Sequence, residues 1–364
     1  MTPADPPTPP GPPGAPDPAR GPLPTTAAGV PGAGGDPAAA AAGDPGADAE
    51  HARQALDRVR DTIATVIVGQ EGVVTGLVTA LLVRGHVLLE GVPGVAKTLL
   101  VTTLARSLEL DATRVQFTPD LMPADVTGQT ILDRSGDGFR FREGPVFTNL
   151  LLADEINRTP PRTQAALLEA MQERQVSVDG HARPLPEPFL VVATQNPVEH
   201  EGTYPLPEAQ LDRFLFKLQV PYPSREQELE IVARHASGSD AGGPADTEVA
   251  PVAGARELAA ARAAVRSVTV SEEVRGYLVD LVRATREAPS VELGVSPRGA
   301  TMLLHAAKAW AWLAGRSFVT PDEVKAVTKP TLRHRLVLRP ELELEGADAD
   351  GVLDGLLASV PVPR

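Results

Sequence analysis

The chain has 364 residues, a formal net charge of −13 at neutral pH and no cysteine. The missing cysteines exclude disulfides, thiolate metal sites and cysteine nucleophiles, which favours a reducing, cytoplasmic location. The acidic charge disfavours nonspecific binding of nucleic acid, and no apolar run reaches the about 18–20 residues that a membrane span needs. We therefore expect a soluble protein with no membrane span and no nucleic-acid partner.

Residues 1–50 are predicted to form a disordered leader. The first 48 residues hold 14 Pro, 9 Gly and no aromatic residue. Such a segment cannot bury enough apolar surface to offset the entropy lost on ordering. We expect a passive leader, and a tether is the alternative.

Residues 51–235 are predicted to form an α/β core. Apolar residues at helical spacing cover 56–67 and 72–83, and buried strands are expected in four short apolar runs, at 86–90, 113–117, 149–153 and 189–194. Helical segments separate the main runs, which predicts a parallel sheet with helices on both faces. Ligands of such sheets bind beyond the carboxyl ends of the strands.

A phosphate-binding turn is predicted at 87–98, where an apolar run leads into a glycine-containing turn and Lys-Thr (VLLEGVPGVAKT). In such a turn, backbone N–H groups and the start of the next helix face polyphosphate, while Lys97 supplies charge and Thr98 holds Mg²⁺. The usual pattern is G-x-x-x-x-G-K-[ST]. Gly91 fits this pattern, but Ala96 stands at the second glycine position. Lys97 is one of only five lysines, against 29 arginines, which favours a specific role for it.

The apolar run at 150–155 (LLLADE) ends in two acidic residues. At the end of a strand, Asp154 is placed to hold Mg²⁺ through water and Glu155 to act on an attacking water, and phosphoryl transfer to water needs both. The alternative is a pair of strand-end acids that face solvent. The βαβ pattern between Lys97 and this pair favours the catalytic interpretation.

Two further polar residues follow in the core. Asn196 ends the run VVATQN and is a candidate to hold the same water or to contact the γ-phosphate; a turn-forming Asn before Pro197 is the alternative. Arg213 follows Asp212, and it is either a partner in a surface ion pair or an arginine finger that enters the nucleotide site of a neighbouring chain. The sequence leaves both interpretations open.

A linker rich in Gly, Ala and Asp is predicted at 236–254, followed by a small helical domain at 255–345 and a C-terminal tail at 346–364. Three helix starts in the helical domain carry recognisable caps: Ser271, Ser296 before Pro297, and the capping box from Thr320 to Glu323.

Arg298 lies in the first turn of the helix that starts after Ser296, where a cation opposes the helix dipole. That position is unfavourable without a nearby anion. Arg298 is therefore a candidate for contact with the γ-phosphate, which would couple the nucleotide to the angle of the helical domain. An exposed arginine that bonds loop carbonyls is the alternative.

Taken together, these residues resemble the AAA+ ATPases, and specifically the MoxR family. The matching stretches extend over about 50–340: VIVGQ (66–70), GVPGVAKT (91–98), TPDLMPADVTG (118–128), EGPVF (143–147), LLADEINRTPPRTQAALLEAMQE (151–173), ATQNPVEHEGTYPLPEAQLDRF (193–214) and GVSPRGA (294–300). The resemblance also accounts for Ala96, because MoxR-like phosphate turns commonly carry Ala there.

The resemblance implies a role for each candidate. Lys97 and Thr98 look like the Walker A pair, and Asp154 and Glu155 like the Walker B pair, which makes Thr98 and Asp154 the expected Mg²⁺ ligands. Contacts with ATP are then implied for the whole turn: Gly91, Val92, Pro93, Gly94, Val95, Ala96, Lys97, Thr98 and Leu99.

The resemblance also assigns the remaining polar candidates. Asn196 looks like sensor 1, Arg213 like the arginine finger and Arg298 like sensor 2. The residues that match the adenine-binding position of AAA+ proteins are Val68, Gly69 and Gln70.

Two insertions are implied as well. The segment 114–145 matches the insertion in helix 2 of this clade, and 174–188 matches the hairpin before sensor 1. Asp179-Gly180 independently predicts a hairpin turn. Near that turn, His181 and Arg183 are interpreted as solvated residues; the alternative is that they face a substrate in the central pore.

The resemblance implies a homo-oligomeric ring, with a hexamer expected. ATP and Mg²⁺ would lie between the core and the helical domain, at the junction of two subunits. MoxR-like proteins are generally associated with partners that bear von Willebrand factor A domains and with the maturation or activation of client proteins. We expect an ATPase that remodels, matures or activates a partner protein. The alternatives are a nucleotide-gated scaffold with negligible hydrolysis and a nucleic-acid-dependent motor.

Overall fold

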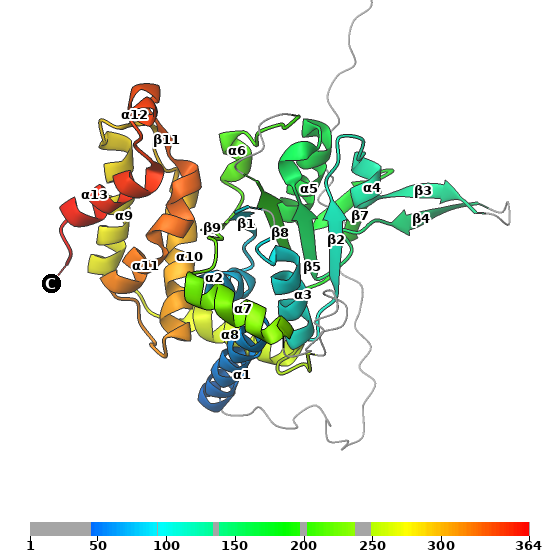
Figure 1. The fold of residues 1–364 in the computed structure, drawn as a ribbon, viewed down its shortest axis with the longest axis horizontal. Coiled ribbons are helices and arrows are strands. Elements are labelled where there is room, and N and C mark those ends of the chain that lie inside the picture. Colours follow the sequence, from blue (N-terminus) through cyan, green and yellow to red (C-terminus); the bar gives the residue numbers. More distant parts are fainter. Residues whose placement is uncertain (1–44, 93, 134–137, 197–201, 237–248, 364) are drawn as a thin grey trace, which may run out of the picture. The chain divides into compact units, whose positions relative to one another are not determined.

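The computed structural model describes residues 45–92, 94–133, 138–196, 202–236 and 249–363 (Figure 1). The predicted leader lies outside the described residues except for its last six, which begin helix α1 (Pro45–Val66). Most of the predicted linker at 236–254 also lies outside them.

A five-stranded parallel sheet forms the centre of the core, in the order β2-β5-β8-β1-β9. Its strands are β1 (Val87–Glu90), β2 (Ala112–Gln116), β5 (Leu150–Asp154), β8 (Leu190–Gln195) and β9 (Phe216–Gln219). Four of them confirm the predicted strands. The edge strand β9 was not predicted, because its four residues include Lys217, which forms an ion pair with Glu90 of β1 at 2.7 Å.

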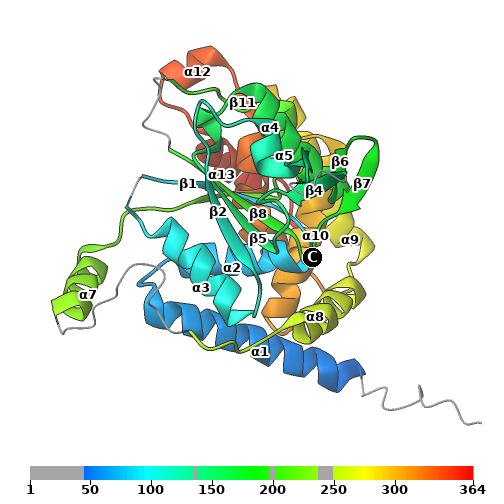
Figure 2. The ribbon, with the colours of Figure 1, turned by 90° about the vertical axis from the view of Figure 1, so that its right-hand side faces the viewer.

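Helices cover both faces of the sheet, which confirms the predicted fold class. Along β1, Val87 and Leu89 join an apolar cluster on one face and Leu88 joins the cluster on the other. Figure 2 shows the first face covered by α1, α2 (Glu71–Leu82) and α3 (Lys97–Ser107), and the second by α4 (Pro123–Thr127) and α5 (Pro161–Glu173). Because successive strand residues point to opposite faces, apolar runs of this kind build a core on each side.

Two antiparallel hairpins extend from the core. One consists of β3 (Gly128–Leu132) and β4 (Phe139–Glu143) and projects from the molecule in Figure 1. The other consists of β6 (Gln175–Val178) and β7 (His181–Pro184), with both turn residues, Asp179 and Gly180, at positive φ. The insertion expected at 114–145 starts too early, because residues 114–116 pair with β5 and belong to the central sheet.

The C-terminal part of the chain is mainly helical. It begins with the short helix α6 (Glu208–Leu211) and with α7 (Arg225–Ala236). The helices that follow are α8 (Ala255–Ser267), α9 (Glu272–Glu287), α10 (Pro297–Leu313), α11 (Pro321–Leu332), α12 (Pro340–Leu344) and α13 (Ala349–Ser359). This part also contains a small pair of strands, β10 (Val291–Leu293) and β11 (Val337–Leu338). The predicted caps are confirmed at Ser271, Ser296 and Thr320.

The predicted C-terminal tail contains the helix α13. Leu353 of this helix is fully buried in the apolar cluster that the helical domain shares with one face of the sheet. The stretch GVLDGLLAS places its apolar residues on one side of a helix, so burial of that side holds the segment in place. No helix in the described segments combines the length and hydropathy that crossing a bilayer requires.

Candidate nucleotide-binding site

The predicted phosphate turn joins the carboxyl end of β1 to the first residue of α3, Lys97. Ala96 precedes the helix at φ 58° and ψ 25°, in the left-handed region. Glycine reaches this region without steric strain, whereas a Cβ is disfavoured there. The backbone therefore shows why a glycine is usual at this position, and Ala96 adopts the same conformation.

Gly91 lies too close to a neighbouring strand for any side chain. A Cβ on Gly91 would lie 2.6 Å from the carbonyl oxygen of Val220, which follows β9. The Gly91 carbonyl in turn accepts a hydrogen bond of 2.7 Å from the Lys97 ammonium group. Among the other predicted turn residues, Val92, Val95, Thr98 and Leu99 are half-buried, Gly94 and Ala96 are exposed, and Pro93 lies outside the described residues.

The Lys97 ammonium group is close to the acidic pair that the sequence singled out. Burial lowers the pKa of Lys97, while the charges of Asp154 and Glu155 oppose this shift. The structure thus brings one cation and two carboxylates together beyond the carboxyl ends of β1 and β5, which flank β8 in the sheet. The carboxylate of Asp154 and the hydroxyl of Thr98 are ligands of the kind that Mg²⁺ takes alongside phosphate oxygens, so these residues fit a Mg²⁺–nucleotide complex.

Thr194 of β8 fixes the geometry of the acidic pair. Its hydroxyl donates to Asp154 Oδ1 at 2.6 Å and accepts from the Glu155 backbone N–H at 2.9 Å. Glu155 itself has φ 56°, a left-handed conformation that turns the chain sharply after β5. One hydroxyl therefore holds both the carboxylate of Asp154 and the strained turn that aims Glu155.

Two residues of β2 complete this network, and sequence reasoning missed both. Arg114 donates to Asp154 Oδ2 at 3.1 and 2.6 Å and to the Gln116 side-chain oxygen at 2.9 Å. The Gln116 amide then donates to Glu155 Oε2 at 2.7 Å, and Arg158 donates to the same oxygen at 3.2 Å. The alternation of Arg114 and Gln116 with apolar Val115 at the end of a predicted strand could have marked them as residues near the site, although it does not indicate their partners.

Asn196 is buried directly after β8, the strand between β5 and β1. The preceding residue, Gln195, accepts a hydrogen bond of 3.4 Å from the Gly91 N–H. Asn196 therefore lies beside the phosphate turn and one strand away from Asp154. This position agrees with the expected role at an attacking water.

The loop expected to bind adenine lies near the same end of the sheet. Gln70 donates to the carbonyl of Pro221 at 3.3 Å, and a Cβ on Gly69 would meet the side chain of Gln227. Val68, Gly69 and Gln70 are all half-buried. This loop and Gly91 thus adjoin the same segment after β9.

Arg213 lies elsewhere, near the amino ends of the strands. It is half-buried, and its guanidinium donates to the carbonyl of Leu168 in α5 at 2.9 Å. Two residues later, the Leu215 N–H bonds the carbonyl of His86, immediately before β1. His86 and Gly91 lie at opposite ends of β1, about 15 Å apart.

Arg298, on the helical domain, also lies near the amino ends of the strands. Ser296, two residues before it, donates to Asp212 Oδ2 at 3.2 Å. Burial lowers the pKa of His86 to about 4, and the charges of Arg174 and Arg298 add to this shift. Arg298 is exposed and makes no hydrogen bond or ion pair within the described part of the chain. Within one chain, Arg298 and the phosphate turn therefore lie toward opposite ends of the strands.

The two residues considered near the Asp179 turn differ in their surroundings. His181 is exposed, as expected for a solvated residue. Arg183 is half-buried, and its guanidinium lies 4.0 Å from the ring centroid of Phe141 in β4. Arg183 therefore connects the two hairpins through a cation–π contact.

The chain matches two family models. Residues 86–216 match the ATPase family associated with various cellular activities (AAA), and residues 283–354 match the AAA lid domain. The first match contains the phosphate turn, the acidic pair, Asn196 and Arg213, and the second contains Arg298.

Similar proteins extend over most of the chain. The chaperone MoxR1 of Mycobacterium tuberculosis is 43% identical over 85% of this chain and 82% of its own length, and the protein MoxR of Paracoccus denitrificans is 34% identical over 84% and 96%. The crystal structure of a candidate ATPase from Cytophaga hutchinsonii superposes with a TM-score of 0.81 at 40% identity, over 88% of this chain and 98% of that one. The chain belongs to the MoxR family of AAA+ ATPases.

Proposed function

We propose that this protein hydrolyses ATP at a site shared by two neighbouring subunits and uses the cycle to remodel, mature or activate a partner protein. The observation that carries the proposal is the convergence of Lys97, Asp154 and Glu155 beyond the carboxyl ends of β1 and β5, on either side of β8. A cation for phosphate, a carboxylate for Mg²⁺ and a second carboxylate for water are the groups that ATP hydrolysis requires.

The positions of the two arginines support a shared site. Arg213 and Arg298 both lie near the amino ends of the strands, whereas the phosphate turn lies beyond the carboxyl ends. Each arginine is thus separated from the phosphate turn of its own chain by about the length of a strand. In a ring built by head-to-tail contacts, two different surfaces of neighbouring subunits meet at every junction. We propose that Arg213 and Arg298 contact the γ-phosphate held by the next subunit.

The proposed chemistry assigns one task to each residue. Glu155 polarises the attacking water and Asn196 orients it, while Lys97 and the two arginines of the neighbour neutralise charge on the transferred phosphoryl group. Mg²⁺, held by Thr98 and Asp154, would supply further neutralisation of the phosphate oxygens. Loss of the γ-phosphate removes the anion that Arg213 and Arg298 contact, so neighbouring subunits are free to rearrange.

The name of one relative, the chaperone MoxR1, supports a protein client as the object of this motion. We propose a homo-oligomeric ring, with a hexamer as the expected form. A protein with a von Willebrand factor A domain is the proposed partner. A pull-down from cells that express the tagged chain, with Glu155→Gln to hold ATP, tests for such a partner; recovery of other proteins alone would remove it from the proposal.

Phosphate release by the purified full-length protein tests the activity itself. We expect the wild type to hydrolyse ATP and Glu155→Gln to bind ATP normally but to hydrolyse it about 100-fold more slowly, the loss typical of a general base. The matched control is Glu173→Gln, an exposed glutamate at the end of α5. Tight ATP binding without hydrolysis by the wild type would instead support a nucleotide-gated scaffold. Strong stimulation by DNA or RNA would support a nucleic-acid motor.

A further inference from the structure

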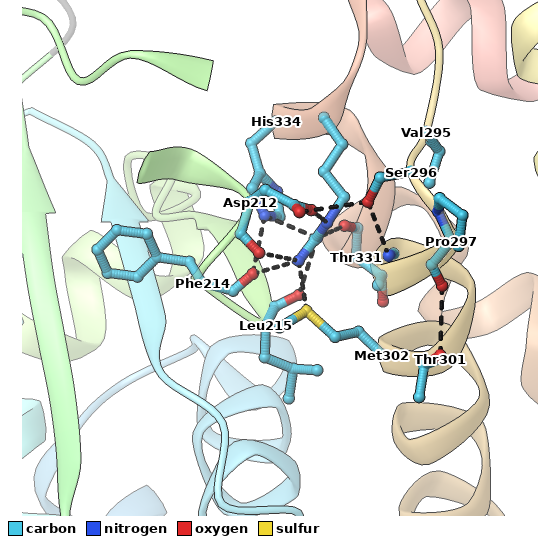
Figure 3. A network of polar contacts seen from close by, with 12 residues as sticks. Asp212, Phe214, Leu215, Val295, Ser296, Pro297, Thr301, Met302, Thr331 and His334 are labelled. Carbon is cyan, nitrogen blue, oxygen red and sulfur yellow. Dashed lines mark hydrogen bonds and ion pairs between the residues drawn. The ribbon is translucent and has the colours of Figure 1, made fainter. Parts of the chain in front are cut away.

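The segment 212–215, between α6 and β9, carries Arg213 and presents several acceptors to the helical domain. Arg335, the last residue of the 3₁₀ turn that follows α11 (Arg333–Arg335), donates hydrogen bonds to these acceptors. Its guanidinium donates to Asp212 Oδ1 at 2.7 Å and to the carbonyls of Phe214 at 2.5 Å, Asp212 at 3.2 Å and Leu215 at 3.4 Å. Figure 3 shows these acceptors gathered on one side of the network, next to the residues of α10 and α11.

Arg335 is almost wholly enclosed. Its side chain is 2% exposed, and it also donates to the carbonyl of Thr331 within its own domain. Burial lowers the pKa of Arg335 to about 10 and Asp212 opposes the shift, so the group remains charged at neutral pH. A planar guanidinium can direct donors at three carbonyls and a carboxylate at once, which an ammonium group cannot do. The contact therefore fixes the orientation of the segment as well as its position.

The same carboxylate reaches the helix that carries Arg298. Asp212 Oδ2 accepts a hydrogen bond of 3.2 Å from the hydroxyl of Ser296, and that hydroxyl accepts from the Gly299 N–H at 3.2 Å as the N-cap of α10. A Cβ on Gly299 would lie 3.0 Å from Arg335 Cδ, so the start of α10 also packs against Arg335. Asp212 and Arg335 thus link Arg213, on the core, to Arg298, on the helical domain.

We propose that Arg335 is a positioning residue that holds Arg213 and Arg298 as one unit for the nucleotide of the neighbouring subunit. This inference rests on the proposed function. The contacts that the structure gives Arg335 are all with protein groups, so the proposed role is exerted through other residues. It acts by fixing segment 212–215 against the start of α10, so a movement of the helical domain necessarily moves both arginines together.

Replacement of Arg335 tests the inference through the separate steps of the reaction. Arg335→Met should leave the binding of a fluorescent ATP analogue unchanged, because the phosphate turn lies at the other end of β1. It should lower kcat about 100-fold, the effect of displacing a catalytic group by about 1 Å. Arg335→Lys keeps the charge but not the fork, and it should behave in the same way.

The matched control is Arg333→Met. Arg333 lies in the same turn and forms an ion pair of 3.0 Å with Asp350, within the helical domain. Among the described residues, no hydrogen bond or ion pair joins Arg333 to segment 212–215, so its loss should leave kcat within about twofold of the wild type even if the melting temperature falls. An equal loss of kcat in both variants would mean that any weakening of the helical domain has this effect, and the inference would be wrong.

Mixed rings distinguish positioning from a general loss of folding. Glu155→Gln subunits lack the group that polarises water but hold Arg213 and Arg298 correctly. Arg335→Met subunits keep Glu155 but no longer hold these two arginines in place. In an equal mixture, about a quarter of the junctions pair the intact Glu155 of one variant with the arginines of the other. We expect the mixture to hydrolyse ATP well above the mean of the two separate variants. A rate equal to that mean overturns the inference.

Hydrogen exchange provides a readout that does not depend on activity. In Arg335→Met, the backbone amides of 211–215 and 296–300 should exchange faster than in the wild type, and those of the phosphate turn should not change. Unchanged exchange at 211–215 overturns the inference even if activity falls. If the wild type hydrolyses no ATP, the proposed function fails, while the exchange measurement still decides whether Arg335 positions this segment.

Discussion

Arg114 of β2 donates two hydrogen bonds to a single oxygen of Asp154, at 3.1 and 2.6 Å. The arginine therefore occupies the carboxylate that we propose as a Mg²⁺ ligand. It also bonds the Gln116 oxygen, which turns the Gln116 amide toward Glu155. The two carboxylates of the site are thus both held by side chains of the edge strand β2.

Removal of this ion pair should make Mg²⁺ binding tighter. In Arg114→Met, a divalent ion no longer competes with the guanidinium for Asp154. Because the Arg114 side chain is 52% exposed, the pair contributes about 1 kcal/mol, which predicts about fivefold tighter Mg²⁺ binding in the presence of ADP. Calorimetry with and without EDTA measures this. Metal-free ADP should bind both proteins equally, and weaker Mg²⁺ binding by the variant would contradict the prediction.

Lys97→Ala should abolish tight binding of ATP. The Lys97 ammonium group has a single hydrogen bond in the described structure, to the Gly91 carbonyl, and is half-buried near two carboxylates. Its loss removes the main cation for phosphate but little packing, so thermal unfolding without nucleotide should change little. A fluorescent nucleotide titration checks the binding, and retained tight binding of ATP would refute the assignment of the phosphate turn.

Ala96→Gly should preserve nucleotide binding and stabilise the protein slightly. Ala96 adopts φ 58°, where an L-residue is disfavoured by about 1 kcal/mol relative to glycine. The greater entropy of glycine in the unfolded chain offsets part of this gain, which leaves an expected net gain of up to about 0.5 kcal/mol. Urea unfolding measures the difference. A clear loss of stability would show that the Ala96 methyl group makes a contact that outweighs the strain.

Acid should destabilise the protein through His86. Its Nδ1 accepts from the Val191 N–H at 3.0 Å and its Nε2 lies 3.1 Å from the Met171 carbonyl, an arrangement that requires the neutral ring. Burial lowers its folded-state pKa to about 4, below the unfolded value of about 6.5, so below pH 6.5 the unfolded chain binds a proton that the folded chain does not.

Stability should therefore fall as the pH drops from about 6.5 to about 4. Between pH 7.5 and 5 this one group contributes a loss of about 2 kcal/mol. Burial also lowers the pKa of His334 and adds a loss in the same direction. Urea unfolding of the wild type and His86→Gln at both pH values isolates the effect of His86. An equal pH dependence in the two proteins would show that His86 does not contribute.

The sequence predicted the elements whose signal is local. Four strands appear as short apolar runs, and the caps at Ser296 and Thr320 follow from neighbouring residues alone. β9 escaped prediction because Lys217 breaks its apolar run, and its charge is balanced only by Glu90 on another strand. Asp154, Glu155 and Asn196 were also found from local sequence, because each directly follows or ends an apolar run.

Contacts between distant segments could not be predicted. Arg114 bonds Asp154 because β2 and β5 are neighbours in the sheet, and Arg335 bonds Asp212 because the helical domain docks at the amino ends of the strands. The residues around Arg114 and Arg335 in the sequence do not indicate which carboxylate each arginine will contact. The same limit applies to Arg298, because its place near the amino ends of the strands depends on how the helical domain docks.

The most direct test of a shared site is a mixture of Arg213→Ala and Glu155→Gln subunits. Each variant alone should be nearly inactive, because one lacks the arginine offered to its neighbour and the other lacks the group that polarises water. If Arg213 acts on the neighbouring subunit, the mixture should regain activity at the junctions where an intact Glu155 meets an intact Arg213. A rate that stays at the weighted mean of the two variants, at every mixing ratio, would contradict this account and would indicate that Arg213 acts on the nucleotide of its own chain.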